Sequence, residues 1–316
     1  MGAPGMIHRV RELLGSDVRT VVPLGEGTDH VAYEVDGAYV VRQRKPVDGV
    51  DLAEAIRREA DLLGVIAGVS PIPVPEVVAA APDEGLVVQR KLPGATLLDR
   101  PPVDPAALVD QLADFLSAIH GVPGERVAGL VEEDRYPHAD YLAEAAETVP
   151  DLTHLLDADQ RRAVDRFLAT APPPEPDDLL LCHNDLGAEH LLVAPDGVRL
   201  TGVLDWSDAA LADPAHDLGR LYRDLGPDVA ARLATRLCPP VSDAQGADVP
   251  TTDGPGAEVP GADGPGAGAS VADDLLARAA FHARCALIED LAFGVTGGDR
   301  RYADAALARL ARTFAV

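Results

Sequence analysis

The stretch "LCHNDLGAEHLLV", residues 181–193, decides the fold of this chain of 316 residues. It places two histidines, an asparagine and an aspartate within the eight residues from His183 to His190, and then continues into apolar residues. Polar groups at this density, followed by a strand-like run, predict a loop held at the mouth of a sheet. Asp185 and His190, five residues apart, are therefore the first candidates for chemistry.

A second strand and another aspartate follow this loop. The turn "APDG" (194–197) leads into "VRLTGVLDW", which is typical of a strand, so residues 190–205 are predicted to form a hairpin. Asp205 stands at its end, twenty residues after Asp185.

The N-terminal third is rich in strand signals. Within residues 18–42, two runs of alternating apolar and polar residues flank "GEGTD" (25–29) and predict strands. The Asp-Gly of "VDGAY" predicts a tight hairpin turn. A helix is predicted for 51–68, a proline-rich connector for "SPIPVPEVV" (70–78), and a buried strand for "GLVVQRKLPG" (85–94).

The rest of the chain is mainly helical. Apolar residues at helical spacing predict helices from Asp104, over 138–149 and 157–170, between 213 and 237, and twice more towards the C-terminus. Residues 241–270 are rich in Gly, Pro, Ala and acids, and predict a disordered or flexible insertion. The chain is thus expected to be α+β and bilobal, with a small sheet lobe over 1–92, a helical lobe over 93–316, and a nucleotide cleft between them.

Charge and composition exclude several classes of function. A formal charge of -25 argues against nucleic acid as a partner, since phosphate binding needs a basic surface. The same charge favours either a cationic substrate or simple solubility. Without a long apolar run, an N-terminal signal core or a cysteine framework, we expect a cytoplasmic protein with free thiols and no membrane segment.

Phosphoryl transfer from a nucleotide needs a group that orients the accepting hydroxyl, a metal site and a cation that holds the phosphates. The kinase catalytic loop places Asn five residues after its Asp, where this chain has His190. Upstream, Arg42 ends a strand and Glu59 follows seventeen residues later on the predicted helix. This chemistry requires five features in a fixed order, and the chain has them in that order: a glycine loop, a basic residue on a strand, a glutamate on a helix, the Asp185 loop and Asp205.

The chain resembles the aminoglycoside phosphotransferase family, which has a protein-kinase-like fold. The blocks "LGEGTDHVAYEVDGAYVVR", "READLL", "LADFLSAIHGVP", "HNDLGAEHLLV" and "TGVLDWSDAALADPAHDLGRL" carry the resemblance, which covers nearly all of the chain except 241–270. His190 in place of Asn is similar to the aminoglycoside 2''-phosphotransferases and, next, to the macrolide 2'-phosphotransferases. The resemblance implies Mg²⁺ and ATP or GTP as phosphate donor.

Roles follow from the resemblance together with the chemistry. Asp185 is expected to orient or deprotonate the hydroxyl, and Asp205 and His190 are expected to bind the metal. Mg²⁺ prefers oxygen ligands, so His190 has three alternative roles: it acts through water, contacts a phosphate or is structural. His183 is expected to brace the loop. The nucleotide is expected to contact residues of the N-terminal part: Gly25, Gly27, Thr28, Arg42 (or Arg44 or Lys45 in its place), Glu59 (unless it pairs with Arg57 or Arg58), Gln89, Arg90 and Leu92.

The substrate is expected to be a small cationic molecule with hydroxyl groups. Asp208, near the loop, and Glu289 and Asp290, on a helix after the insertion, are the candidate carboxylates, unless the last two belong to a solvated helix face. An aminoglycoside fits them best, and an aromatic content of 4% disfavours the wide apolar pocket that a macrolide needs. The alternatives are a metabolic kinase for an amino alcohol or sugar and a nucleotide-binding pseudokinase. We expect a monomer or weak dimer.

Overall fold

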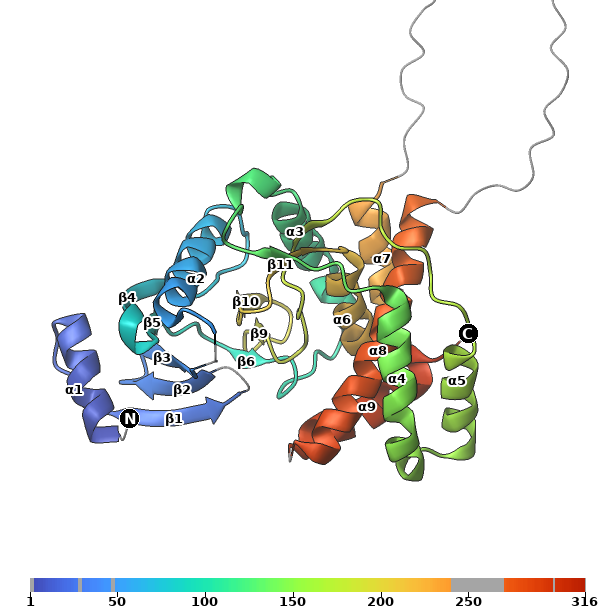
Figure 1. Ribbon diagram of the computed structural model, residues 1–316, viewed down its shortest axis with the longest axis horizontal. Helices are drawn as coiled ribbons and strands as arrows, with labels where there is room; N and C mark the ends of the chain where they lie inside the picture. Colours follow the sequence, from blue (N-terminus) through green and yellow to red (C-terminus); the bar gives the residue numbers. More distant parts are fainter. Residues whose placement is uncertain (1–2, 28–29, 47–48, 240–269, 298, 316) are drawn as a thin grey trace, which may run out of the picture.

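The computed structural model describes residues 3–27, 30–46, 49–239, 270–297 and 299–315. The N-terminal part holds a five-stranded antiparallel sheet in the order β1-β2-β3-β5-β4 (Figure 1). Its strands are β1 (Val21–Glu26), β2 (His30–Val35), β3 (Tyr39–Arg44), β4 (Val77–Ala81) and β5 (Leu86–Arg90). The predicted sheet lobe is confirmed, and β4 corrects the prediction of a plain connector: the three prolines end at Pro75, and the chain is free to pair with β5 from Val77.

The predicted tight turn joins β2 to β3. Asp36 and Gly37 both have positive φ, at 51° and 69°, as a two-residue hairpin turn of this handedness requires. The Asp36 carboxylate also accepts hydrogen bonds from the backbone N–H groups of Arg19 and Thr20, which fixes the entry into β1.

Two helices accompany the sheet. Helix α2 (Leu52–Ala67) begins at Asp51, whose carboxylate accepts the Glu54 N–H at 3.0 Å, and it buries Ile56, Glu59 and Leu63 on one face. Helix α1 (Ala3–Leu14), which the sequence analysis did not predict, packs its buried Met6 and Val10 into the apolar cluster beneath the sheet.

The C-terminal part is mainly helical, as predicted. Its helices are α3 (Val109–His120), α4 (His138–Leu152), α5 (Ala158–Leu168), α6 (Ala215–Leu225), α7 (Pro227–Leu237), α8 (Val271–Thr296) and α9 (Arg300–Thr313). Its short strands are β6 (Ala95–Thr96), β7 (Glu132–Glu133), β8 (Leu180–Cys182), β9 (Leu191–Val193), β10 (Leu200–Val203) and β11 (Ala210–Ala212). In Figure 1 the β9–β10 hairpin lies between the N-terminal sheet and the bundle around α8.

Buried apolar side chains form separate clusters around this hairpin. The largest cluster joins the C-terminal half of α2, α3, the hairpin, α6, α7 and the start of α8. A second cluster joins α4, α5, the C-terminal half of α8 and α9. The hairpin therefore lies in the main core, which fixes the residues at its ends.

The segment after β5 is tied to the hairpin. The Thr201 hydroxyl donates to Pro93 O at 2.5 Å, the Leu97 N–H donates to Leu191 O at 2.9 Å, and β6 pairs with β9. Gly202 allows this approach, because a Cβ there would lie 2.7 Å from Leu92 Cδ1. The chain that leaves the sheet is thus fixed directly on the predicted catalytic hairpin.

The predicted insertion over 241–270 falls almost wholly outside the described residues. Its last residue, Ser270, is described and belongs to α8 instead. It is the N-cap of that helix and forms a reciprocal capping box with Asp273. Of the described helices, none combines the length and apolar character needed to cross a membrane.

A buried ionic network joins α6 to α8 and α9. Arg223, 1% exposed, lies 2.7 Å from Asp224 Oδ1 and 2.8 Å from Asp290 Oδ2, and Arg309 lies 2.7 Å from Asp224 Oδ1. Asp224 in turn accepts the Ala188 N–H at 2.6 Å. The network therefore links the helices to the loop that carries Asp185.

Replacing Arg223 with methionine should lower the free energy of unfolding by about 3–5 kcal/mol, because Asp290 loses its buried partner and Asp224 keeps only Arg309. Urea denaturation followed by circular dichroism measures the change. The control is Arg162→Met, whose ion pair with Asp159 is exposed and should matter by under about 1 kcal/mol. Equal stability of the two variants would contradict the role of the network.

Candidate active site

The loop between β8 and β9 is held by Asp217 of α6. The Asp217 carboxylate accepts the backbone N–H of His183 at 3.1 Å and that of Asn184 at 2.9 Å. Asn184 has a φ of 68°, a left-handed conformation that asparagine adopts more readily than most residues other than glycine. Because Asp217 is buried and receives two backbone donors, it holds the loop in this shape.

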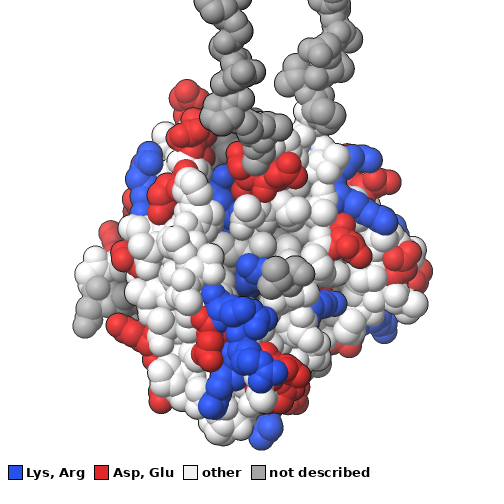
Figure 2. Space-filling model, turned by 90° about the vertical axis from the view of Figure 1, so that its right-hand side faces the viewer, with Lys and Arg blue, Asp and Glu red and all other residues white. Residues whose placement is uncertain are grey.

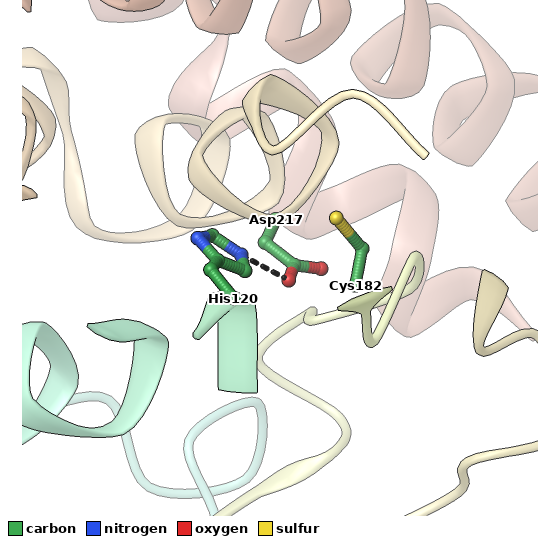
Figure 3. Close-up of side chains that lie close together, drawn as sticks. All are labelled: His120, Cys182 and Asp217. Carbon is green, nitrogen blue, oxygen red and sulfur yellow. Dashed lines mark hydrogen bonds and ion pairs between the residues drawn. The ribbon is translucent and has the colours of Figure 1, made fainter. Parts of the chain in front are cut away.

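Figure 3 shows His120 and Cys182 on either side of Asp217. His120 Nε2 lies 3.1 Å from Asp217 Oδ2, and the Cys182 thiol lies 3.6 Å from Ala212 O, at hydrogen-bonding distance for sulfur. Burial raises the pKa of Cys182 well above its usual value, so the thiol stays protonated. His120, Cys182 and Asp217 thus have partners within the protein, and together they brace the loop.

His183 also braces the loop, as predicted. Its ring is fully buried, and Nε2 lies 2.8 Å from Leu204 O while Nδ1 accepts the Asp185 N–H at 3.3 Å. Burial lowers the pKa of His183, which favours the neutral ring that this bonding requires. Trp206 packs against it at 4.6 Å between ring centres and anchors the turn at Asp205.

Asp185 lies between the side chains of His190 and Arg220. His190 Nε2 is 3.1 Å from Asp185 Oδ2, and Arg220 Nε is 3.3 Å from Oδ1. Burial acts to raise the pKa of Asp185, but the hydrogen bond from His190 and the charge of Arg220 together lower it far below its usual value. Asp185 is therefore a fixed carboxylate, suited to orienting a hydroxyl more than to storing a proton.

Arg42, Glu59 and Asp205 meet in one chain of ion pairs. Arg42 Nη1 lies 2.8 Å from Glu59 Oε1, and Nη2 lies 2.7 Å from Asp205 Oδ1. The predicted Arg42–Glu59 pair is confirmed, whereas Lys45 bonds Gly27 O. Of the three basic residues considered at the end of this strand, Arg42 is the one that joins the sheet lobe to Asp205.

Asp205 is held at the end of the hairpin in a left-handed conformation, with a φ of 53°. The Ser207 hydroxyl donates to its Oδ1 at 2.8 Å. Burial opposes ionisation, but Arg42, His190 and Ser207 lower the pKa of Asp205 to about 2. The carboxylate is thus charged at neutral pH, as a magnesium ligand must be.

The other predicted nucleotide contacts lie at different places in the sheet lobe, and one of them lies outside the described residues. Gly27 lines the main cleft and closes its loop by donating its N–H to His30 O at 2.9 Å, Gly25 lies at a bulge between β1 and β2, and Thr28 lies outside the described residues. At the other end of the sheet the Arg90 N–H already donates to Glu76 O, and its side chain pairs with Glu76.

The remaining two contacts lie on either side of Arg90. Gln89 is buried within the sheet, and Leu92 is half-buried against Gly202. Base recognition by the backbone at Gln89, Arg90 and Leu92 stays a prediction, with the Arg90 N–H already engaged.

A cleft of about 790 Å³ opens from Asp185 between α4, α6 and α8. Arg220 is the one lysine or arginine among the described residues that line it. The acidic lining residues are Glu144, Asp185, Glu189, Asp208, Glu289 and Asp290. Figure 2 shows that basic side chains instead gather in a stripe on the face turned towards the viewer, with acids around it. The acidity of the cleft is therefore local and does not simply repeat the net charge.

The structure separates the three predicted substrate carboxylates. Asp208 is exposed at the mouth of the cleft, and Glu289, 71% exposed, lies 3.6 Å from Arg220. Asp290 points the other way, onto Arg223, and burial raises its pKa to about 7. Glu289 is thus exposed in the cleft, where contact with a substrate stays a prediction, while Asp290 belongs to the buried network.

Sequence analysis missed Arg220, Glu144 and Glu189. Glu189 stands inside the quoted loop and was passed over because the kinase pattern assigns it no role. Together with Asp185 and His190 it offers ligand atoms that lie within 4.8 Å of one another. Arg220 follows Asp217 by one helical turn, which places it on the same face of α6, and this spacing was the available signal.

The residues present fit a magnesium–nucleotide complex in part. Asp205 offers a carboxylate, and Arg42 offers a cation beside it. His190 Nε2 already contacts Asp185, which favours a role in orienting that carboxylate; direct coordination of a metal by His190 stays a prediction.

Three comparisons connect this geometry with known proteins. Residues 20–246 match the family described as "Phosphotransferase enzyme family". An aminoglycoside 3'-phosphotransferase of Streptomyces fradiae is 32% identical over 182 residues, which are 52% of this chain and 66% of that protein. A viomycin phosphotransferase of Streptomyces vinaceus is 29% identical over 57% of this chain and 67% of its own length. The match to the first relative thus spans slightly less than two thirds of its length.

Solved structures share the fold over nearly the whole chain. The GDP complex of an aminoglycoside 2'-phosphotransferase-IIIa has a TM-score of 0.68 at 21% identity and covers 99% of both chains. A macrolide 2'-phosphotransferase type I has a TM-score of 0.58 at 19% identity, covering 98% of this chain and 99% of that one. The expected α+β, bilobal, kinase-like fold is confirmed.

Proposed function

The chain belongs to the phosphotransferase enzyme family, and from this premise we propose that it transfers the γ-phosphoryl group of ATP or GTP, with Mg²⁺, to a hydroxyl group of an aminoglycoside. One observation carries the proposal. Asp185 lies at the inner end of an acid-lined cleft, and the Arg42–Glu59–Asp205 chain lies on the other side of the same loop. A phosphate held by Arg42 and a hydroxyl held by Asp185 would meet there.

The chain's own residues supply positioning and charge. Arg42, held by Glu59, would bind the phosphates, and Asp205 would hold the metal. When bound, Mg²⁺ neutralises the charge that develops on the transferred group. Asp185 accepts the hydroxyl's hydrogen bond, and its two partners His190 and Arg220 fix the direction of its oxygens. The backbone of the loop around Gly27 covers the phosphates.

The lining of the cleft supports a cationic acceptor. Its carboxylates outnumber its single arginine, and an aminoglycoside carries several ammonium groups among its hydroxyls. The similarity to aminoglycoside 3'-phosphotransferases of Streptomyces fradiae and Streptomyces ribosidificus, at 32% and 31% identity, points the same way. His190 supports the 2''-phosphotransferase branch, and a low aromatic content disfavours a macrolide.

A coupled assay of nucleotide consumption tests the proposal, with ATP and GTP each offered against aminoglycosides, macrolides, viomycin, amino sugars and amino alcohols. We expect Mg²⁺-dependent turnover with an aminoglycoside. Turnover with a metabolite alone would replace the proposed substrate, and nucleotide binding without turnover on any compound would favour a pseudokinase, which the charged Asp185 and Asp205 oppose.

A metabolic sugar kinase is the second candidate. An N-acetylmuramate/N-acetylglucosamine kinase of Caulobacter vibrioides is 33% identical over 48% of this chain and 45% of its own length. Its named sugars carry hydroxyl groups like those of an aminoglycoside, but N-acetylated amines are not cationic. The acid-lined cleft therefore favours the first candidate.

Expectations on the organisation and surroundings of the chain belong to this proposal. We infer two lobes, over 1–92 and 93–316, because the segment after β5 passes directly onto the β9–β10 hairpin. We also infer that the chain binds no nucleic acid, since it is strongly acidic. A cytoplasmic monomer or weak dimer that does not bind membranes stays the expectation. Size-exclusion chromatography with light scattering measures the oligomeric state.

Replacing Glu289 with glutamine should raise the KM for a cationic substrate by about 1.5–5-fold, the effect of one well-solvated charge, and leave kcat unchanged. Steady-state kinetics at low and high salt measure it, and high salt should reduce the difference. The matched control is Glu125→Gln, the same change at an exposed residue that lines none of the described cavities. Equal KM values for the two variants would remove Glu289 from the substrate site.

A further inference from the structure

Another group of metal-ligand side chains lies where α4, α6 and α8 meet, apart from the phosphate residues, and one of its members, His282, also lines the main cleft. His138 begins α4, Asp213 precedes α6, and His282 lies in the middle of α8. Each is at most 5% exposed, and their ligand atoms all lie within 4.8 Å of one another. Three segments that are far apart in sequence thus bring two imidazoles and a carboxylate to one buried point.

The separations are too long for direct hydrogen bonds. His138 Nε2 lies 3.6 Å from Asp213 Oδ2, and His282 Nε2 lies 3.9 Å from the same oxygen. N–H···O bonds have heavy-atom distances of about 2.7–3.2 Å. Zinc bonds of about 2.0–2.2 Å at tetrahedral angles would place the ligand atoms roughly 3.4 Å apart. The two distances to Asp213 Oδ2 therefore exceed the spacing of a zinc site by a few tenths of an ångström, and the two histidine nitrogens lie within 4.8 Å of each other.

His282 leaves a ring nitrogen without a hydrogen bond. Within the described part of the chain, its Nε2 has no hydrogen-bond partner, although the residue is only 5% exposed. Buried polar atoms are nearly always paired, so this nitrogen calls for a ligand. The neighbouring ring of His216, 3.9 Å away between centres, is neutral because burial lowers its pKa to about 3.

Outer contacts hold the other two side chains in the ligand geometry. His138 Nδ1 lies 3.1 Å from Pro173 O, the bond by which metal-binding histidines fix their second nitrogen as the ligand. Asp213 Oδ1 accepts the Ala215 N–H at 2.9 Å, and Arg278 Nε donates to Oδ2 at 2.7 Å. Ligating carboxylates are likewise held by such donors in metal sites.

We propose that His138, Asp213 and His282 bind one Zn²⁺ ion. Two imidazoles and one carboxylate form a donor set that zinc uses in proteins, with a fourth position left for water or another oxygen. A cavity of about 190 Å³, lined in part by His138, Asp213 and Glu175, gives access. Glu175, 55% exposed, lies at the edge of this cavity, with Oε2 3.6 Å from His138 Nε2.

The ion would tie α4 to α8, two walls of the acid-lined cleft. Asp213 and Glu175 bring two negative charges and Arg278 one positive charge, so a dication is accommodated. The proposal is independent of the substrate and of phosphoryl transfer.

The test uses the full chain, freed of metal by a chelator and then titrated with Zn²⁺ by calorimetry. We expect one equivalent to bind at this site, Tm to rise with zinc, and Co²⁺ to give the strong visible absorption of a four-coordinate site. His282→Phe, which keeps an aromatic ring but no ligand atom, and His138→Asn should each weaken this binding by about 100-fold or more, beyond the loss from an outer contact. Circular dichroism confirms that the variants are folded.

Two controls assign the site. His154→Ala removes an exposed histidine and should leave zinc binding unchanged. His190→Ala removes a member of the other described group near Asp185, so zinc bound there is lost in that variant alone. The proposal is overturned if folded wild-type protein binds no zinc, if His282→Phe binds it as tightly as wild type, or if only His190→Ala abolishes binding.

Discussion

Replacing Asp185 with asparagine should lower kcat by about two to four orders of magnitude, the usual effect of removing a positioned acid–base group. Asparagine keeps the shape of the side chain, but its amide cannot accept the hydroxyl's proton and no longer carries the charge that His190 and Arg220 face. The coupled assay measures kcat, and Tm shows whether the fold is kept. Because Arg220 retains Glu289 nearby, we expect only a small change in Tm.

The matched control for this variant is Asp178→Asn. Asp178 is exposed, lies seven residues upstream and lines none of the described cavities, so its loss should leave kcat within about twofold of wild type. A kcat for Asp185→Asn above about a tenth of the wild-type value would remove Asp185 from the reaction centre.

Replacing Asp205 with asparagine should reduce kcat/KM by about 100-fold or more, because the metal loses an anionic ligand and Arg42 loses one of its two carboxylate partners. The expected signature is a higher Mg²⁺ concentration for half-maximal activity and weaker binding of the Mg²⁺–nucleotide complex. Asp185→Asn should change neither quantity, so the two variants separate the roles of the two aspartates.

Ser207→Ala gives the graded control for Asp205. It removes one neutral hydrogen bond to Asp205 Oδ1 and leaves the carboxylate in place. Its effect on kcat/KM should stay below about tenfold, the contribution of one such bond. If Asp205→Asn retains a wild-type response to Mg²⁺, the metal is held elsewhere.

The phosphate-side residues could be predicted because their relation is local. Arg42 lies in β3 and Glu59 on α2, the helix that follows, so seventeen residues of chain suffice to bring them together. Asp205 ends a hairpin that starts at the quoted loop. In both cases the sequence pattern itself determines which side chains meet.

The cleft was harder to predict because its walls come from distant helices. Glu289 and Asp290 were taken together as substrate contacts, yet successive residues on a helix point about 100° apart. Glu289 accordingly faces Arg220, while Asp290 faces Arg223. Arg220 and Glu144 were missed because tertiary packing determines which helices face Asp185, and a sequence pattern does not show this packing. Helix α1 was missed because its apolar face depends on the sheet that it covers.

The Arg42–Asp205 ion pair has a consequence for how the protein is made. Its partners are 163 residues apart. At about 5–20 residues per second, the ribosome needs roughly 8–33 s to add that length of chain. The sheet lobe therefore emerges with Arg42 held by Glu59 and His30 but without Asp205, and the phosphate site is completed only after the β9–β10 hairpin has been synthesised and packed. Truncated chains that end before Asp205 would carry half of a nucleotide site.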